Sequence, residues 1–166
     1  DQWRVRGLGA WKDAVLRHWP ETLPLLDTVT DPSQMVLARY DHHTLPLPFG
    51  KRLVFIGDSA HATSPQLGQG ANMALLDALA LARALAAQGD LASALGEYAR
   101  QRLWHIRLYQ SASFLFTPAY QSDSAALAWL RDAIMAPLSR IPPAPVILAA
   151  LVAGAWGAPL AAMREG

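Results

Sequence analysis

The sequence contains no cysteine, which excludes disulfide bonds, thiolate zinc sites and cysteine nucleophiles. It is also poor in charge, because charged residues make up 16% and hydrophobic residues 52% of its 166 residues. Basic and acidic residues number 14 and 13, so no field of one sign would attract nucleic acid. We therefore expect a folded protein that does not bind nucleic acid and whose surface is partly covered by a partner.

Recognisable targeting signals are missing from the first residues. The opening "DQWRVRGLGAW" has no initiating methionine, signal-peptide pattern or transit pattern, and we expect a fragment of a longer, cytoplasmic protein. Residues 146–163 carry no charge and reach the minimum length of a membrane span, but Gly154, Gly157 and Pro159 interrupt them. A buried or partner-covered helix is the simpler interpretation, so we do not expect the chain to cross a membrane.

Proline and glycine divide the first half of the chain into short elements. A helical pattern covers residues 10–19 and is closed by Pro20. Apolar and polar residues alternate over residues 35–43, which suits an extended segment. Residues 52–56 form a segment of strand length that is continuously apolar from residue 53, typical of a buried parallel strand. The predicted fold class is α/β with a predominance of helix.

Two long helices are predicted next. Residues 71–87 are nearly all Ala, Leu or Met, so this helix is apolar on every side and should be enclosed. Its carboxylate at Asp77 must be paired or bonded to backbone, most simply as a clamp on the adjoining loop. Gly89 ends this helix and Asp90 caps the next one.

The second helix is expected over residues 91 to about 113, and a further helix over residues 124–138 ends near Pro137. The second helix carries an apolar stripe with spacings of four, four, three and three residues, which predicts the side that faces the core. Its other face is expected to be solvated. The predicted core positions are Leu95, Ala99, Leu103, Ile106 and Tyr109, and the predicted solvated ones are Glu97, Arg100, Arg102, His105 and Arg107.

The junction "LVFIGDSAHATSPQLGQGAN", residues 53–72, is the segment with the features of a ligand-binding site. A strand that ends in a glycine turn, followed by a loop and a helix, brings free N–H groups and the positive end of a helix dipole together. Gly68 and Gly70 leave the backbone open to a ligand. The carboxylate of Asp58 would repel phosphate, so it favours the hydroxyl groups of a ribose-like chain.

Residues 57–85 resemble the second flavin motif of the flavoprotein aromatic hydroxylases, the para-hydroxybenzoate hydroxylase-like monooxygenases. The motif positions are occupied by Gly57, Asp58, Ala60, His61, Pro65, Gly68, Gly70, Asn72, Asp77 and Ala78, with Ser59 in place of the usual alanine. The resemblance implies the C-terminal part of an FAD/NAD(P)-binding fold. Residues 1–50 would be the tail of the substrate-binding domain, 51–113 the C-terminal part of the FAD-binding domain and 114–166 a C-terminal helical region.

The resemblance also implies how FAD is held. Asp58, which follows Gly57, would bind the ribityl hydroxyls. The loop from Pro65 to Gly70, with Gly68 and Gln69 in it, would line the isoalloxazine. The amides of Ala71 and Asn72 would face the pyrimidine end of the ring.

The implied reaction is hydroxylation of a small aromatic substrate with NADH or NADPH and oxygen, through a flavin C4a-hydroperoxide. The chemistry is the cofactor's, so no catalytic side chain and no metal site are predicted. The family's Gly-x-Gly-x-x-Gly near the start is not matched, because Gly7 and Gly9 lack a third glycine and a preceding strand. The missing partner would then be the N-terminal half of the enzyme, with a homo-oligomer left open.

Two alternatives stay open. A strand followed by Gly-Asp-Ser also occurs in GDSL-type serine esterases, where Ser59 would be the nucleophile. Such enzymes need a distant Asp-x-x-His, and the one histidine after residue 61 is His105, preceded three positions earlier by Arg102. The second alternative is a non-catalytic interaction fragment of flavin-fold ancestry.

Overall fold

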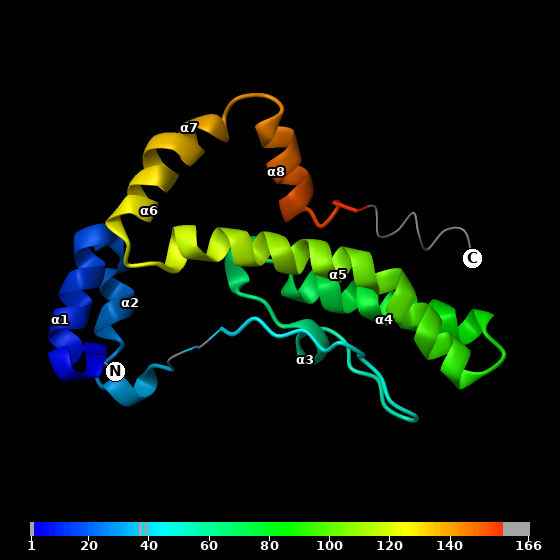
Figure 1. Cartoon of the computed structure of the whole chain (residues 1–166). Helices are drawn as coiled ribbons and strands as arrows, with labels where there is room; N and C mark the ends of the chain where they lie inside the picture. Colours follow the sequence, from blue (N-terminus) through cyan, green and yellow to red (C-terminus); the bar gives the residue numbers. More distant parts are fainter. Residues whose placement is uncertain (1, 37, 39, 158–166) are drawn as a thin grey trace. The chain divides into compact units, whose positions relative to one another are not determined.

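The computed structural model describes residues 2–36, 38 and 40–157, with the side chains of residues 2–4 left out. The described residues are predominantly helical (Figure 1). The chain divides into two compact units, residues 1–39 and residues 40–166, which are described separately here. The predicted assignment of residues 1–50, 51–113 and 114–166 to three regions of a parent fold stays a prediction.

The first unit contains two helices and two 3-10 turns. The helix predicted over residues 10–19 is confirmed; it starts earlier, continues through a kink at Gly7 (φ 82°) and stops before Pro20. Asp31 caps the last turn by accepting a hydrogen bond from the Ser33 amide at 2.7 Å. The elements are α1 (Gln2–His18), a 3-10 turn (Pro20–Thr22), α2 (Leu23–Asp27) and a second 3-10 turn (Pro32–Gln34).

The second unit is built on a pair of long helices that run side by side in Figure 1. The first of them has the predicted extent to within one residue, and Asp90 caps the second by accepting from the Ser93 amide at 2.9 Å. The elements are α3 (Asp58–His61), a 3-10 turn (Pro65–Leu67), α4 (Gly70–Ala87), α5 (Leu91–Gln121), α6 (Ala125–Leu130), a π turn (Arg131–Met135), α7 (Ala136–Leu138) and α8 (Ala144–Val152).

Helix α5 is longer than predicted, because it continues to Gln121 instead of ending near residue 113. Pro118 lies inside its last turn. Proline there removes one backbone donor but leaves the rest of the ladder intact. The hydroxyl of Thr117 donates to the Ser113 carbonyl at 2.7 Å, which adds a side-chain bond in this turn.

Small side chains bring α4 and α5 together. Ala80 is 0% exposed and Ala84 is buried beside Tyr98, so the helix axes can approach closely. A second cluster beside it joins the glycine loop, α4, α5 and α8; its members are Leu67, Met73, Ile106, Tyr109 and Leu151. The prediction that α4 is enclosed on every side is wrong, because Leu75 is 71% exposed.

Neither predicted strand is present in the described residues, so the α/β expectation is corrected to helical for this part of the chain. The segment 52–56 is extended, but its one β contact is an antiparallel bridge between Phe49 and Val54. Val54 and Ile56 pack toward the α4–α5 core, whereas Leu53 is 59% exposed. A buried parallel strand needs neighbouring strands on its edges, and none of the described segments provides one. Residues 37 and 39 of the other predicted strand lie outside the described residues.

Helix α4 is long and apolar enough to cross a membrane by length and composition alone. Its packing on α5 and its fully buried carboxylate at Asp77 are features of a core helix in a folded protein. The uncharged residues 146–163 were the other candidate span. The helix that forms there, α8, has nine residues, too few to span a bilayer, and residues 158–163 lie outside the described residues.

The close contact between α4 and α5 predicts that Ala80→Leu destabilises the fold by about 1 to 3 kcal/mol, because the new side chain has no space in the interface. Ala82→Leu, two residues along the same helix and exposed, should change the free energy of unfolding by less than about 0.5 kcal/mol. Urea denaturation of both variants measures the difference. Equal effects would show that the two helices do not pack through Ala80.

Candidate functional site

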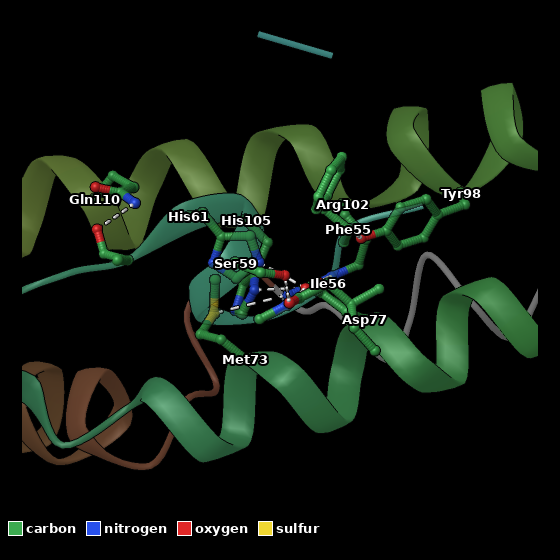
Figure 2. A network of polar contacts seen from close by, with 12 residues as sticks. Phe55, Ile56, Ser59, His61, Met73, Asp77, Tyr98, Arg102, His105 and Gln110 are labelled. Carbon is green, nitrogen blue, oxygen red and sulfur yellow. Dashed lines mark hydrogen bonds and ion pairs between the residues drawn. The ribbon is translucent and has the colours of Figure 1, made fainter. Parts of the chain in front are cut away.

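The site is organised around Asp77, a fully buried residue of α4. Its Oδ2 accepts hydrogen bonds from the Gly57 amide at 2.8 Å and from His61 Nε2 at 2.6 Å. Its Oδ1 accepts from Arg102 Nε at 2.6 Å. Figure 2 shows Asp77 from α4 meeting His61 from α3 and Arg102 from α5. The expectation that Asp77 is paired and bonded to backbone is confirmed.

The carboxylate of Asp77 stays charged in spite of its burial. Burial by itself raises the pKa of Asp77, but the hydrogen bonds from His61, Arg102 and the Gly57 amide together outweigh it and lower the pKa below its usual value. A charged carboxylate with three donors is the arrangement that makes a buried ion pair tolerable, because both oxygens accept hydrogen bonds and the charge is paired with Arg102.

Two residues of α5 that were predicted to be solvated lie in this network. Arg102 is 1% and His105 is 3% exposed, and Arg102 Nη1 lies 3.0 Å from His105 Nδ1. Conversely Leu103, predicted to face the core, is 47% exposed. The buried face of α5 is thus wider than its apolar stripe and includes Arg102, because the buried charge of Asp77 requires a cation on the same side. Leu95, Ile106 and Tyr109 are buried as predicted.

His105 is held in its neutral form. Burial first, and then the positive charge of Arg102, lower the pKa of His105 to about 4, against a smaller opposing effect of the Gly154 backbone. Its ring packs on Tyr109 with the centroids 4.7 Å apart, and its Nε2 atom is buried without a hydrogen-bond partner. A protonated His105 would therefore place a second buried cation next to Arg102.

Gly57 is required for both conformation and space. It is the N-cap of α3, with φ 58° and ψ −143°, a backbone conformation that side-chain-bearing residues rarely adopt. A Cβ atom on Gly57 would also lie 2.9 Å from the Ala74 Cβ on α4. Helix α3 can consequently lie directly against α4.

Asp58 is the first residue of α3, and its side chain is exposed. Within the described part of the chain its carboxylate has no hydrogen bond or ion pair, and its Oδ1 lies 3.6 Å from the position of a Cβ atom on Gly70. A pocket of about 10 Å³, room for one water molecule, opens there into about 310 Å³ of space continuous with solvent. Its lining residues are Asp58, His61, Thr63, Leu67, Gln69, Gly70, Met73, Tyr109 and Gln110.

The glycine loop has the backbone that a ligand could approach. Gly68 has a left-handed conformation (φ 62°) after the Pro65–Leu67 turn, and α4 begins at Gly70 with no side chain capping its first amides. Of the predicted cofactor residues, the pocket brings Asp58, Gln69 and Gly70 together. The other five do not line it: Gly57 is buried, Pro65, Gly68 and Ala71 are exposed, and Asn72 is partly buried.

The side chains of Gln69 and Asn72 hold the segment that follows α8. Gln69 Nε2 donates to the Val152 carbonyl, and Asn72 Nδ2 donates to Gln69 Oε1 at 2.8 Å. Gly154 (φ 74°) approaches so closely that a Cβ atom on it would lie 2.0 Å from Asn72 Nδ2. Sequence reasoning did not find this contact, because the segments are about 80 residues apart and share no pattern.

A larger cavity of about 340 Å³ lies away from Asp58, between residues 44–48 and α5. Its lining is mainly apolar, and His61 lines both this cavity and the smaller pocket. No residue predicted to hold a cofactor lines it. It is therefore separate from the predicted flavin site.

The geometry of Ser59 does not favour a hydrolase. Its hydroxyl donates to the Ile56 carbonyl at 2.7 Å, and among the described histidines none is hydrogen-bonded to it. His61 uses Nε2 to bind Asp77 instead. A serine nucleophile needs a base within hydrogen-bond reach, so this arrangement argues against the esterase alternative.

The comparison with protein families agrees with the flavin motif. The family model described as "FAD binding domain" matches residues 15–108, more than half of the chain. The chain belongs to this FAD-binding family. The resemblance to the FAD-dependent monooxygenases is thereby confirmed, and FAD is the cofactor of the family.

The chain is similar to curated monooxygenases. It is 30% identical over 123 residues to aurachin C monooxygenase/isomerase of Stigmatella aurantiaca, covering 73% of the chain and 32% of that relative. It is 40% identical over 84 residues to 2-heptyl-3-hydroxy-4(1H)-quinolone synthase of Pseudomonas aeruginosa, covering 51% and 22%. FAD-dependent urate hydroxylase of Klebsiella pneumoniae is 32% identical over 93 residues, covering 54% and 23%. The chain thus spans about a third or less of these relatives, and no solved structure matches it.

Gly57→Ala should lower the free energy of unfolding by about 1 to 3 kcal/mol, because alanine has to adopt a positive φ and meets the Ala74 side chain. Gly96→Ala provides the matched control. Gly96 lies in α5 with open space around it, so alanine there should stabilise by about 0.5 to 1 kcal/mol. Thermal unfolding followed by circular dichroism measures both, and two changes of the same sign would contradict the assigned backbone conformations.

The neutral state of His105 predicts a loss of stability in mild acid. The unfolded chain takes up a proton on this histidine below about pH 6.5, whereas the folded chain does so only near pH 4. The free energy of unfolding should fall by about 3 kcal/mol at most as the pH drops through this window. The lowered pKa of Asp77 adds a further loss of stability, but only below about pH 4, where an aspartate in the unfolded chain takes up a proton.

Urea denaturation at intervals between pH 7 and pH 4 measures this dependence. His105→Gln should flatten the slope between pH 6.5 and 4, since glutamine does not titrate and can still accept from Arg102. His43→Gln, a change at an exposed position, should leave the slope as it is. An unchanged slope in His105→Gln would show that another group is responsible.

Proposed function

We propose that this chain is the part of an FAD-dependent monooxygenase that holds the ribityl chain and the isoalloxazine ring, in an enzyme that hydroxylates a small aromatic substrate. The observation that carries the proposal is the free carboxylate of Asp58 beside Gly70 at the uncapped start of α4. Family membership supports it by placing FAD in a chain with this arrangement.

The chemistry of the donor set fits the flavin. Asp58 is an acceptor without a partner among the described residues, and ribityl hydroxyls are donors. The first amides of α4 are donors, and the carbonyl oxygens and ring nitrogens of the pyrimidine end are acceptors. The pocket, of about 10 Å³, has no room for the ring itself, so this chain would hold the cofactor through Asp58 and offer the Gly70 backbone to the ring.

The start of α4 also fits the charge of the cofactor. A helix N-terminus stabilises a nearby anion by about 0.3 to 2 kcal/mol. Reduction places negative charge on the pyrimidine end of the ring, so an uncapped helix start there favours the reduced cofactor. The backbone amides do this without a titratable side chain.

Bound FAD would take two electrons from NADH or NADPH and activate oxygen, of which one atom enters the aromatic ring and the other leaves as water. The residues of this chain bind and orient the cofactor. Neither His61 nor Asp77 is placed as an acid or base toward a substrate, since each is buried and bonded to the other. No catalytic side chain is therefore assigned.

Three further features belong to this proposal. The ADP part of FAD and most of the substrate pocket would be provided by sequence beyond these 166 residues, because the relatives are at least three times as long as the matched region. The substrate would be an aromatic compound, as the relatives named for quinolones and urate suggest. The enzyme would be cytoplasmic, where the nicotinamide reductant is available.

Asp58→Ala, made in the flavoprotein that carries this sequence, should weaken FAD binding about 10- to 100-fold, because charge-assisted bonds to the ribityl hydroxyls are lost. Quenching of flavin fluorescence on titration measures the affinity. Asp123→Ala, an exposed aspartate outside the site, is the matched control and should leave the affinity unchanged. Unaltered affinity in Asp58→Ala would count decisively against the assignment.

The same titration separates the alternatives. A non-catalytic interaction fragment would not quench flavin fluorescence, whatever residue stands at position 58. A serine esterase would be labelled by a fluorophosphonate probe at Ser59, and Ser59→Ala would abolish the labelling. Flavin quenching without labelling supports the proposed function.

A further inference from the structure

We infer that Asp77 is a positioning residue for FAD, which aims the carboxylate of Asp58 at the cofactor by holding both ends of α3. This inference rests on the proposed function and goes beyond it, since it assigns a role in cofactor binding to a residue that is fully buried. A merely structural clamp would support the fold without affecting how Asp58 meets the flavin.

One oxygen atom of Asp77 holds the whole of α3. Oδ2 accepts from the amide of Gly57, the N-cap, and from the side chain of His61, the last residue of the helix. Since α3 is a single turn, these two bonds tie both of its ends to α4. Figure 2 shows the side chains of His61 and Asp77 facing each other.

Asp58 depends on these bonds because it directly follows Gly57. The other end of α3 has independent backbone support, from the Leu45 amide to the Ala60 carbonyl at 2.8 Å and from the His43 amide to the Ala62 carbonyl at 3.0 Å. At the Gly57 end, the hydrogen bond to Asp77 is the polar contact, among the described residues, that links the backbone to α4, beside the close packing of Gly57 on Ala74. Loss of this bond would release the Gly57 turn and with it the direction of Asp58.

Arg102 keeps Asp77 in the state that this role requires. Because Arg102 Nε donates to Oδ1 of Asp77, Oδ2 remains available for the bonds to α3. The positive charge of Arg102 also favours the ionised carboxylate. Arg102 is itself held in place: its Nη1 lies 3.0 Å from His105 Nδ1, and its Nη2 lies 3.7 Å from the Met73 sulfur. An asparagine at position 77 would place an NH₂ group against one of these donors, which breaks either the Arg102 contact or the contact to α3.

A double-mutant cycle in the flavoprotein tests the inference, with the FAD dissociation constant as the readout. Asp58→Ala and Asp77→Asn should each weaken FAD binding about tenfold or more. If Asp77 acts through Asp58, the double variant should bind FAD no more than about twofold more weakly than Asp58→Ala alone. Circular dichroism at the temperature of the titration confirms that every variant is folded.

Matched controls keep the outcome specific. Glu97→Gln breaks an ion pair with Arg100 at the surface of α5 and should leave FAD affinity unchanged. If Asp77→Asn does not fold, Arg102→Lys takes its place in the cycle, because lysine keeps the charge but cannot reproduce the Nε bond. Asp77→Glu keeps a carboxylate at this position but should also weaken FAD binding, since the longer side chain cannot reach Gly57 and Arg102 in the same geometry.

The outcomes are distinct. Effects of Asp58→Ala and Asp77→Asn that multiply would show that Asp77 acts on the fold in general, and would overturn the inference while the proposed function stands. No effect of Asp77→Asn in a folded variant would overturn it as well. No effect of Asp58→Ala would overturn the proposed function itself. Non-additive losses support both.

Discussion

The structure of the second unit depends on one buried carboxylate. Asp77 is the meeting point of α3, α4 and α5, through the Gly57 amide, His61 and Arg102. Removing one partner from such a pair leaves an uncompensated buried charge, which costs about 3 to 5 kcal/mol. The three directional bonds, which join α4 to α3 and to α5, also specify how these elements sit, which the apolar contacts between alanines and leucines do not.

The same network connects structure to function. Helix α4 provides the free amides at its start, at Gly70, and the carboxylate of Asp77 two turns later. Its first turn is therefore an anion-stabilising surface, while its second turn anchors the loop that carries Asp58. The C-terminal end of α8 completes this region, because the Val152 carbonyl accepts a hydrogen bond from Gln69. Family membership shows FAD binding for the family, and this junction is where we propose that the flavin is held.

Local patterns predicted the two long helices and the glycine loop between α3 and α4. Helix α4 follows from its alanine- and leucine-rich sequence, and α5 follows from its apolar stripe. Gly89 after α4 and the cap Asp90 before α5 are signals that depend on a few adjacent residues. The glycine loop and Asp58 were predictable because turn conformations depend on adjacent residues. The pairing of Asp77 was predictable in kind, since an unpaired carboxylate cannot be buried, but its cation could not be identified among the arginines of α5.

Long-range features were not predictable in the same way. The expected strand at 52–56 depends on neighbours that the described residues do not include, so its apolar run forms an extended segment instead. Arg102 and His105 were placed on the wrong face because periodicity counts hydrophobicity and has no access to a charge on another helix. Such contacts depend on which segments meet, and single-sequence spacing does not contain that information.

The sequence by itself determined the position of the two long helices, the glycine turn and the resemblance to the flavoprotein family, because each rests on residues within about thirty positions of one another. Only the tertiary structure decided that Asp77 holds both ends of α3, that Arg102 is buried beside it and that Gly154 closes on Asn72. The physical reason is that hydrogen bonds and steric contacts act over a few ångströms in space, whatever the separation along the chain.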